Sequence, residues 1–352
     1  MKPVAVCRNL LSRQKTSADD LDSYEQWLEN NGIPWERIDC YHYGIIDQLS
    51  NYSALIWHYS NFVNADLMEA QHILDIASEM GLTVFPNHST GWHFDDKIAE
   101  MYALQAAKAP IPNSWVFYEL QACLKWLEND AKYPLVAKLR RGSGASNVKL
   151  LHSFSEAKKY AKRMFSSGYQ PAPSVMYKTY SKVQSVRSAS DFKNRFKKIP
   201  NFLKAHRFGK GMPIEKGYCY FQEFIENEGY DLKVAIVNGK CCAVTRGTRK
   251  GDFRASGGGD VYFKRELVTE QIILSAFAAA KNLKMQAVGF DYVVDKKTGE
   301  GKIIEMCFGN GVAKETLAVG GYWDESLTWH DKPLNVIDEV MSYLFKNNNA
   351  NQ

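Results

Sequence analysis

The chain has 352 residues, of which 45% are hydrophobic, and a formal net charge of +5 at pH 7. This length exceeds what a single compact core usually organises, so we expect two or three domains. The net charge is mild for this size and, taken alone, does not indicate a nucleic-acid partner.

The cysteines and the hydropathy of the sequence indicate in which cellular compartment the protein resides. The seven cysteines are an odd number and none forms a CxxC pair, which argues against a disulfide framework and against a cysteine-rich zinc site. No apolar run reaches the roughly 18 residues that a membrane span needs. Residues 3–7 are too few for the core of a signal peptide. We therefore expect a protein of the reducing cytoplasm with no transmembrane segment.

Residues 1–90 alternate strand and helix. Short apolar runs predict strands at 3–7, 33–38, 54–58 and 82–85. Apolar residues at helical spacing predict helices over 19–30 and behind Asn64, which is a candidate helix cap. Because such alternation is typical of a parallel sheet covered by helices, this region is expected to be an α/β domain.

The pattern changes after residue 90. A helix is predicted over 93–107, and strand-like runs alternate with helices between 114 and 165. From 166 to 217 the periodicity is weak, and between Met176 and Lys216 eleven lysines and arginines stand against two acidic residues. We interpret 91–217 as a central lobe with a basic insertion at about 166–217, which is either a binding arm or a solvated insertion.

From residue 218 onward the chain is rich in strands. They are predicted at 218–225, 232–237, 240–245, 287–294 and 301–306, with helices over 266–282 and 335–345. This region, 218–352, is expected to be the third domain.

The first motif is a strand, a loop of small residues and a second strand over 135–148. The first strand delivers Lys138, and the loop includes Gly142, Ser143, Gly144, Ala145 and Ser146. Small residues let backbone N–H groups approach an anion, and a lysine supplies a point charge to phosphate oxygens. The Walker pattern is absent. The alternative is an ordinary Gly-Ser hairpin.

The second motif is an apolar strand that ends in acidic residues and turns into another strand, over 220–234. An extended backbone can pair with an adenine edge, and the acids that follow can accept ribose hydroxyls. The alternative is that these acids, among them Glu223 and Asp231, are solvated turn residues.

The third motif places one carboxylate on each of two neighbouring apolar strands, Asp291 and Glu305. Acidic side chains are rarely buried without a partner. A Mg²⁺ ion is commonly held by one or two carboxylates together with phosphates, and this pair suits it. The alternative is a pair of salt bridges to lysine or arginine.

The fourth motif is a loop rich in arginine and glycine over 245–259, which contains Arg246 and Arg254. Arginine stabilises charge on a transferring phosphoryl group and binds carboxylates with two hydrogen bonds. Arg254, beside the glycine run, is the favoured active-site candidate, and a solvated loop is the alternative.

These four motifs, in this order, resemble the ATP-grasp superfamily over residues 87–323. Two further matches are Asn87 followed by the segment 94–99, and the Ile-Pro-Asn-Ser run at 111–114. The resemblance implies an ATP-grasp fold of the α/β (α+β) class. Its parts are an N-terminal parallel α/β domain, a small central lobe and a C-terminal lobe with an antiparallel sheet.

The resemblance also implies roles for individual residues, with ATP and Mg²⁺ as cofactors. Lys97 and Lys138 are expected to bind ATP phosphates beneath a lid formed by Gly142, Ser143, Gly144, Ala145 and Ser146. The adenine hinge is expected at Glu223, Phe224 and Ile225, with Asp231 and Lys233 also in the nucleotide site. Arg246 and Arg254 are expected to face an acyl phosphate.

The metal site departs from the pattern of the family. Asp291 and Glu305 are expected to bind Mg²⁺, but Cys307 stands where many members have asparagine. Sulfur is a soft ligand that suits Mg²⁺ poorly. The third ligand is therefore Asn310, a water molecule or, less suitably, Cys307.

The implied activity is a carboxylate–amine ligase that forms an amide through an acyl phosphate and releases ADP and phosphate. The alternatives are an acid–thiol ligase and a nucleotide-binding protein without ligase activity. The carboxylate is a small molecule or a glycan, with a uronic acid of a surface polysaccharide and an acidic peptide as candidates. The basic segment 176–216 is a candidate site for that anion, and a homo-oligomer is compatible with the sequence.

Overall fold

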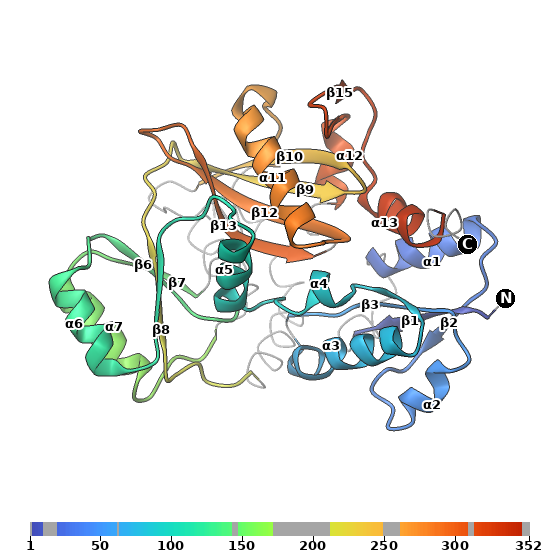
Figure 1. Ribbon diagram of the computed structural model, residues 1–352, viewed down its shortest axis with the longest axis horizontal. Helices are drawn as coiled ribbons and strands as arrows, with labels where there is room; N and C mark the ends of the chain where they lie inside the picture. The colour runs from blue at the N-terminus through green and yellow to red at the C-terminus, as the bar shows by residue number, and fades with distance from the viewer. Residues whose placement is uncertain are drawn as a thin grey trace, which may run out of the picture.

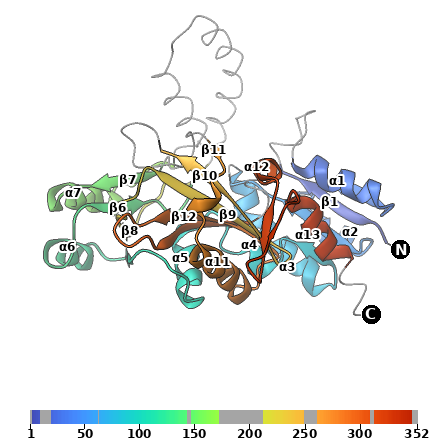
Figure 2. The same cartoon turned by 90° about the horizontal axis from the view of Figure 1, so that it is seen from above.

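The computed structural model describes residues 2–9, 20–61, 63–142, 147–171, 212–248, 261–308 and 313–346. Residues 176–211 of the basic segment lie outside the described residues. Six expected site positions also lie outside them, namely Arg254, Asn310 and residues 143–146 of the expected lid. The described residues form three sheets, which Figures 1 and 2 show as an N-terminal unit, a central lobe and a C-terminal lobe.

The N-terminal sheet is parallel, with the strand order β2-β1-β3-β4. Its strands are β1 (Val4–Arg8), β2 (Trp35–Ile38), β3 (Ala54–His58) and β4 (Thr83–Phe85). Its helices are α1 (Asp20–Asn30), α2 (Ile45–Leu49) and α3 (Asn64–Glu79). The predicted parallel sheet is confirmed. The predicted cap is wrong, because α3 begins at Asn64 and this side chain donates to Met68 Sδ instead.

The central sheet is antiparallel, with the order β5-β8-β6-β7. Its strands are β5 (Ser114–Phe117), β6 (Leu135–Lys138), β7 (Val148–Leu151) and β8 (Cys219–Glu223). Helices α6 (Leu120–Asn129) and α7 (Phe154–Met164) pack beside each other against this sheet, at the left of Figure 1. The strand β8 lies in the region 218–352, which was expected to be the third domain, yet it belongs to the central sheet.

The C-terminal sheet has seven strands, in the order β13-β12-β9-β10-β14-β15, with β11 paired to β10. Its strands are β9 (Tyr230–Val237), β10 (Lys240–Gly247), β11 (Val261–Tyr262), β12 (Ala287–Val294), β13 (Gly301–Phe308), β14 (Tyr322–Asp324) and β15 (Trp329–His330). The described pairs are antiparallel, as expected for this lobe.

The two faces of the C-terminal sheet differ in chemistry because side chains alternate along a strand. One face contributes buried apolar side chains such as Val234, Phe290 and Tyr292 to a core with α11 (Glu270–Asn282), which a short 3-10 helix (Arg265–Leu267) precedes. Asp231 and Lys233, next to these apolar residues in the chain, point to the opposite face.

The helices between the first two sheets lie where the three units meet. They are α4 (His88–Gly91) and α5 (Lys97–Ala106). The helix predicted over 93–107 begins only at Lys97. Asp95 takes a left-handed backbone conformation with φ of 56°, and the Asp96 side chain accepts hydrogen bonds from the N–H groups of Ile98 and Ala99.

The last helix returns to the first unit. After α12 (Ala313–Val319), α13 (Val336–Phe345) begins behind Asn335, whose side chain caps it. Helix α13 packs beside α1 (Figure 1). The rings of Trp27 and Phe345 lie 6.1 Å apart between these two helices. The apolar side chains of α13 therefore belong to the same core as the parallel sheet.

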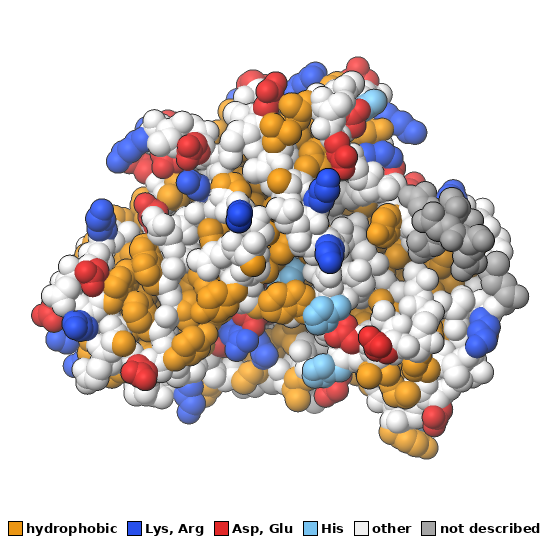
Figure 3. Space-filling view, viewed as in Figure 1, with side chains coloured by type: hydrophobic (Ala, Val, Ile, Leu, Met, Phe, Trp, Pro, Cys, Tyr) orange, Lys and Arg blue, Asp and Glu red, His pale blue; other side chains and the backbone are white. Residues whose placement is uncertain are grey.

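The surface mixes charge signs. Acidic and basic side chains are interspersed over the face in Figure 3, in keeping with the mild net charge. Among the helices in the described ranges, none is both long enough and apolar enough to cross a membrane.

Gly301, at the start of β13, packs tightly. A Cβ atom there would lie 2.5 Å from Ile272 Cγ1 and 3.1 Å from Tyr292 Cδ1. Because overpacking a close-packed core costs roughly 1–3 kcal/mol, Gly301→Ala is expected to lower the free energy of unfolding by about that amount. Urea unfolding checks this, with the exposed neighbour Glu300→Ala as the control. Equal midpoints for the two variants would contradict the packing argument.

Candidate functional site

The charged face of the C-terminal sheet brings carboxylates and cations into register. Asp291 on β12 lies directly opposite Glu305 on β13 and directly opposite Lys233 on β9. Arg246 on β10 lies opposite Asp231. Since directly opposed residues project to the same side of a sheet, these five side chains share one face, which we call the charged face.

Cations contact both oxygens of Asp291. Lys233 Nζ lies 2.9 Å from Asp291 Oδ1, and Arg246 Nη2 lies 2.9 Å from Asp291 Oδ2. Arg246 also donates two hydrogen bonds to Asp231, of 2.6 and 2.8 Å. Burial opposes ionisation of Asp291, but Arg246 and Lys233 outweigh it and hold the pKa of Asp291 below its usual range. The salt bridges that the sequence left open as an alternative are thus present.

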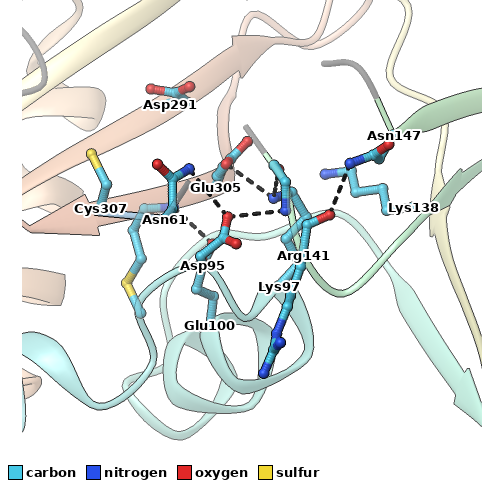
Figure 4. A network of polar contacts seen from close by, with 12 residues as sticks. Asn61, Asp95, Lys97, Glu100, Lys138, Arg141, Asn147, Asp291, Glu305 and Cys307 are labelled. Carbon is cyan, nitrogen blue, oxygen red and sulfur yellow. Dashed lines mark hydrogen bonds and ion pairs between the residues drawn. The ribbon is translucent and has the colours of Figure 1, made fainter. Parts of the chain in front are cut away.

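Two lysines from outside the C-terminal sheet also contact its strand β13. Lys97, the first residue of α5, places Nζ 3.2 Å from Glu305 Oε1 and donates to the carbonyl oxygen of Gly142 at 2.6 Å. Lys138, the last residue of β6, donates from Nζ to the carbonyl oxygen of Ile304 at 2.9 Å. Figure 4 shows Lys97, Lys138 and Glu305 grouped together, with Asp291 on the next strand. The structure therefore brings together the two lysines and two carboxylates singled out in the sequence.

The two lysines differ in their electrostatics. Burial opposes the charge on Lys97, but Glu305 and two other carboxylates outweigh burial and raise the pKa of Lys97. Burial dominates at Lys138, where it lowers the pKa to about 8 although Glu305 partly offsets it. Among the residues that the structure describes, no carboxylate forms an ion pair with Lys138.

The lowered pKa of Lys138 predicts a pH dependence. Lys138 is protonated below pH 8 and loses its charge above it. If it binds phosphate, the affinity for a magnesium complex of a non-hydrolysable ATP analogue is expected to fall above pH 8, by at most about tenfold per pH unit. Calorimetry between pH 7 and 9.5 measures this. Lys138→Met should be flat over that range, whereas Glu100→Gln should keep the slope if Lys138 is its source.

Three residues without a predicted role belong to this site, namely Asp95, Asn61 and Glu100. Asp95, 7% exposed, accepts a hydrogen bond from the backbone N–H of Gly142 at 3.0 Å and one from Asn61 at 3.5 Å. Burial raises the pKa of Asp95 to about 6. Glu100, 3% exposed, accepts from the N–H of Met306 at 3.1 Å, and burial raises its pKa as well. The signal for Glu100 was an acid on the buried side of a helix, three residues after Lys97.

The carboxylate pair fits a magnesium ion, and the sulfur does not. Glu305 is 27% exposed and stands beside Asp291, so the pair offers hard oxygen ligands. Cys307 Sγ accepts a hydrogen bond from Lys233 at 3.3 Å, and burial raises the pKa of its thiol, which keeps it protonated. No cluster of three or more histidine, cysteine or acidic side chains suited to a metal occurs within the described ranges. Asp291 and Glu305 are therefore the candidate ligands, and a metal at Asp291 would share its oxygens with Lys233 and Arg246.

Comparison with known proteins finds similarity in structure but none in sequence. No protein-family model and no curated protein matches the sequence. Solved structures do match. A D-alanine–D-alanine ligase from Bacillus anthracis is 12% identical with a TM-score of 0.55, covering 98% of both chains. An L-amino acid ligase from Bacillus licheniformis is 11% identical with a TM-score of 0.56, covering 98% of this chain and 75% of that one.

A third match is the biotin carboxylase domain of a 2-oxoglutarate carboxylase from Hydrogenobacter thermophilus. It is 12% identical with a TM-score of 0.57, covering 97% of this chain and 69% of that one. The chain has the ATP-grasp fold. The parallel N-terminal sheet and the two antiparallel sheets that the sequence led us to expect are therefore confirmed as parts of one known architecture.

In this ATP-grasp fold, the expected adenine hinge connects two sheets. Glu223 ends β8 in the central sheet, and β9 of the C-terminal sheet begins at Tyr230. Glu223 Oε2 accepts from Asn113 Nδ2 at 2.8 Å, and Ile225 is buried. Asp231, expected near a ribose, instead contacts Arg246 and is 3% exposed. A ribose contact at Asp231 would need this salt bridge to open.

Proposed function

We propose that this protein is an ATP-dependent ligase that activates a carboxylate as an acyl phosphate and joins it to an amine. The observation that carries the proposal is the meeting of Lys97, Lys138, Asp291 and Glu305 at one place, from one helix and two sheets whose strands lie far apart in the chain. Buried lysines beside paired carboxylates suit a metal-bound triphosphate, because lysines bind phosphate oxygens and carboxylates hold the metal that neutralises the rest of the phosphate charge.

Each group has a role in this proposal. Lys97 and Lys138 bind phosphate oxygens, and Glu305 and Asp291 hold Mg²⁺, which when bound neutralises charge on the transferring phosphoryl group. Lys233 and Arg246 hold Asp291 in place and carry positive charge toward the reacting carboxylate. Gly142 lies where the expected lid begins, and its carbonyl oxygen already contacts Lys97.

The nucleotide assignment has support from the similar structures. The D-alanine–D-alanine ligase was solved with ATP, and the biotin carboxylase domain with the magnesium salt of ADP and bicarbonate. For this chain, we extend the proposal to an anionic carboxylate, such as a uronic acid of a surface polysaccharide or an acidic peptide. That extension rests on the eleven basic residues between Met176 and Lys216.

Two measurements test the proposal. Calorimetry with the magnesium complex of a non-hydrolysable ATP analogue should show one saturable site that disappears without Mg²⁺. Incubation with MgATP, hydroxylamine and a panel of acids should give hydroxamate and ADP in equal amounts for the correct acid. Nucleotide binding without hydroxamate from any acid would favour a binding protein over a ligase. A calorimetric blank would reject both.

A further inference from the structure

The charged face continues into an apolar cavity. Its volume is about 360 Å³, within the range of small-molecule sites. Five of its seven lining side chains are wholly apolar, among them Val244, Val261, Phe263 and Val319, and the other two are Tyr262 and Glu315. A cavity with one charged group and mostly apolar walls recognises a ligand with one charged end and an apolar body.

Register places this cavity beside the candidate site. Val244 lies directly opposite Lys233, and Val261 lies directly opposite Arg246, so both valines project from the charged face. Helix α12 covers this part of the sheet, where Val319 packs against Val244. Figure 2 shows β10, β11 and α12 close together along one side of the molecule. The cavity therefore adjoins the part of the charged face that carries Lys233 and Arg246.

The sign of the charge identifies the ligand class. Glu315 is partly buried in the first turn of α12, and it forms no hydrogen bond or ion pair with any residue of the described ranges. A carboxylate beside apolar walls attracts an ammonium group and repels a carboxylate. Lys233 and Arg246, which pair with Asp291 and Asp231, lie on the neighbouring part of the face. The carboxylate of Glu315 thus stands apart from these cations, on the side of the cavity.

We infer that this cavity, under α12, is the site of the amine substrate and that it selects amines with an apolar side chain. The inference rests on the proposed ligase function and deepens it by naming the class of the amine. Glu315 binds the ammonium group, and the walls formed by Val244, Val261, Phe263 and Val319 hold the apolar body.

Three small probes that differ by one group test the charge and the walls. They are 2-phenylethylamine, 3-phenylpropionate, which replaces the ammonium by a carboxylate, and ethanolamine, which lacks the apolar body. Calorimetry on the full chain should give saturable binding for 2-phenylethylamine alone. Glu315→Gln should weaken that binding about tenfold, as expected for loss of a charged hydrogen bond. Preference for 3-phenylpropionate, or equal affinity in the Glu315→Gln variant, would overturn the inference.

A second pair of variants controls for damage to the fold. Ala318 lines the cavity and its neighbour Leu317, 43% exposed, does not, although both lie on α12. Ala318→Trp should abolish binding of 2-phenylethylamine, whereas Leu317→Trp should leave it unchanged, with equal thermal unfolding midpoints. Binding that survives Ala318→Trp would place the amine elsewhere.

Failure of this inference is distinguishable from failure of the proposed function. Each protein is also titrated with the magnesium complex of a non-hydrolysable ATP analogue. Nucleotide binding without amine binding would reject the amine site and leave the ligase proposal standing. Amine binding without nucleotide binding would reject the ligase proposal and leave an amine-binding cavity.

Discussion

Glu305→Gln is expected to lower the rate of ADP formation by at least about a hundredfold, the scale for loss of one group that stabilises transition-state charge. Glu305 faces Lys97 at 3.2 Å, lies opposite Asp291, and is one of the two carboxylates that we propose as ligands of Mg²⁺. Glutamine keeps the shape of the side chain and removes its charge, so the metal loses a ligand and Lys97 loses its closest counter-charge. Initial rates with the acid identified by hydroxamate formation measure the effect.

The matched control for this change is Glu300→Gln. Glu300 precedes β13, its side chain is 60% exposed, and it pairs only with Lys302 among the ion pairs of the described residues. That variant should keep the wild-type rate. A Glu305→Gln enzyme with a normal rate and a normal Mg²⁺ requirement would remove Glu305 from the metal site.

Lys138→Met is expected to lower activity without lowering stability. Loss of the ammonium should lower ADP formation by about 10²–10³-fold, because this charge is proposed to face the phosphates. The same change should leave the free energy of unfolding equal or higher at pH 7, since burial already lowers the pKa of Lys138 to about 8. A group held at a cost to the fold is typical of a functional site.

The control here is Lys132→Met, which removes one exposed lysine from the loop before β6. It should change neither quantity. Urea unfolding and ADP release, measured on the same preparations, give both values. A Lys138→Met protein that is less stable than wild type would mean that Lys138 serves the fold, and unchanged nucleotide affinity would remove it from the site.

The candidate site was visible in the sequence where local patterns decide it. A single carboxylate among the apolar residues of each strand set Asp291 and Glu305 apart in β12 and β13, and a strand followed by small residues marked Lys138. What the sequence could not supply was the pairing of strands. Lys233 and Arg246 contact Asp291 because β9, β10 and β12 align in one register, which depends on residues far apart in the chain.

The same limit applies to the fold. The strand β8 was predicted correctly as a strand, but its place in the central sheet depends on β5 and β6, which lie on the other side of the basic segment. Two strands near the end, β14 and β15, escaped prediction because they have only three and two residues. Asp95 lay within a noted segment, but its left-handed backbone and its bond to Gly142 are tertiary features.

The packing of α13 against α1 has a consequence for how this chain is made. The core around the parallel sheet includes Val336, Val340 and Leu344 together with Val4 and Leu28. A ribosome releases α13 long after the strands of the first unit, because synthesis runs from the N-terminus. The first unit therefore emerges with an unfilled apolar side, and it reaches its final packing only when α13 has left the exit tunnel. Loss of α13 would leave that apolar surface exposed to water.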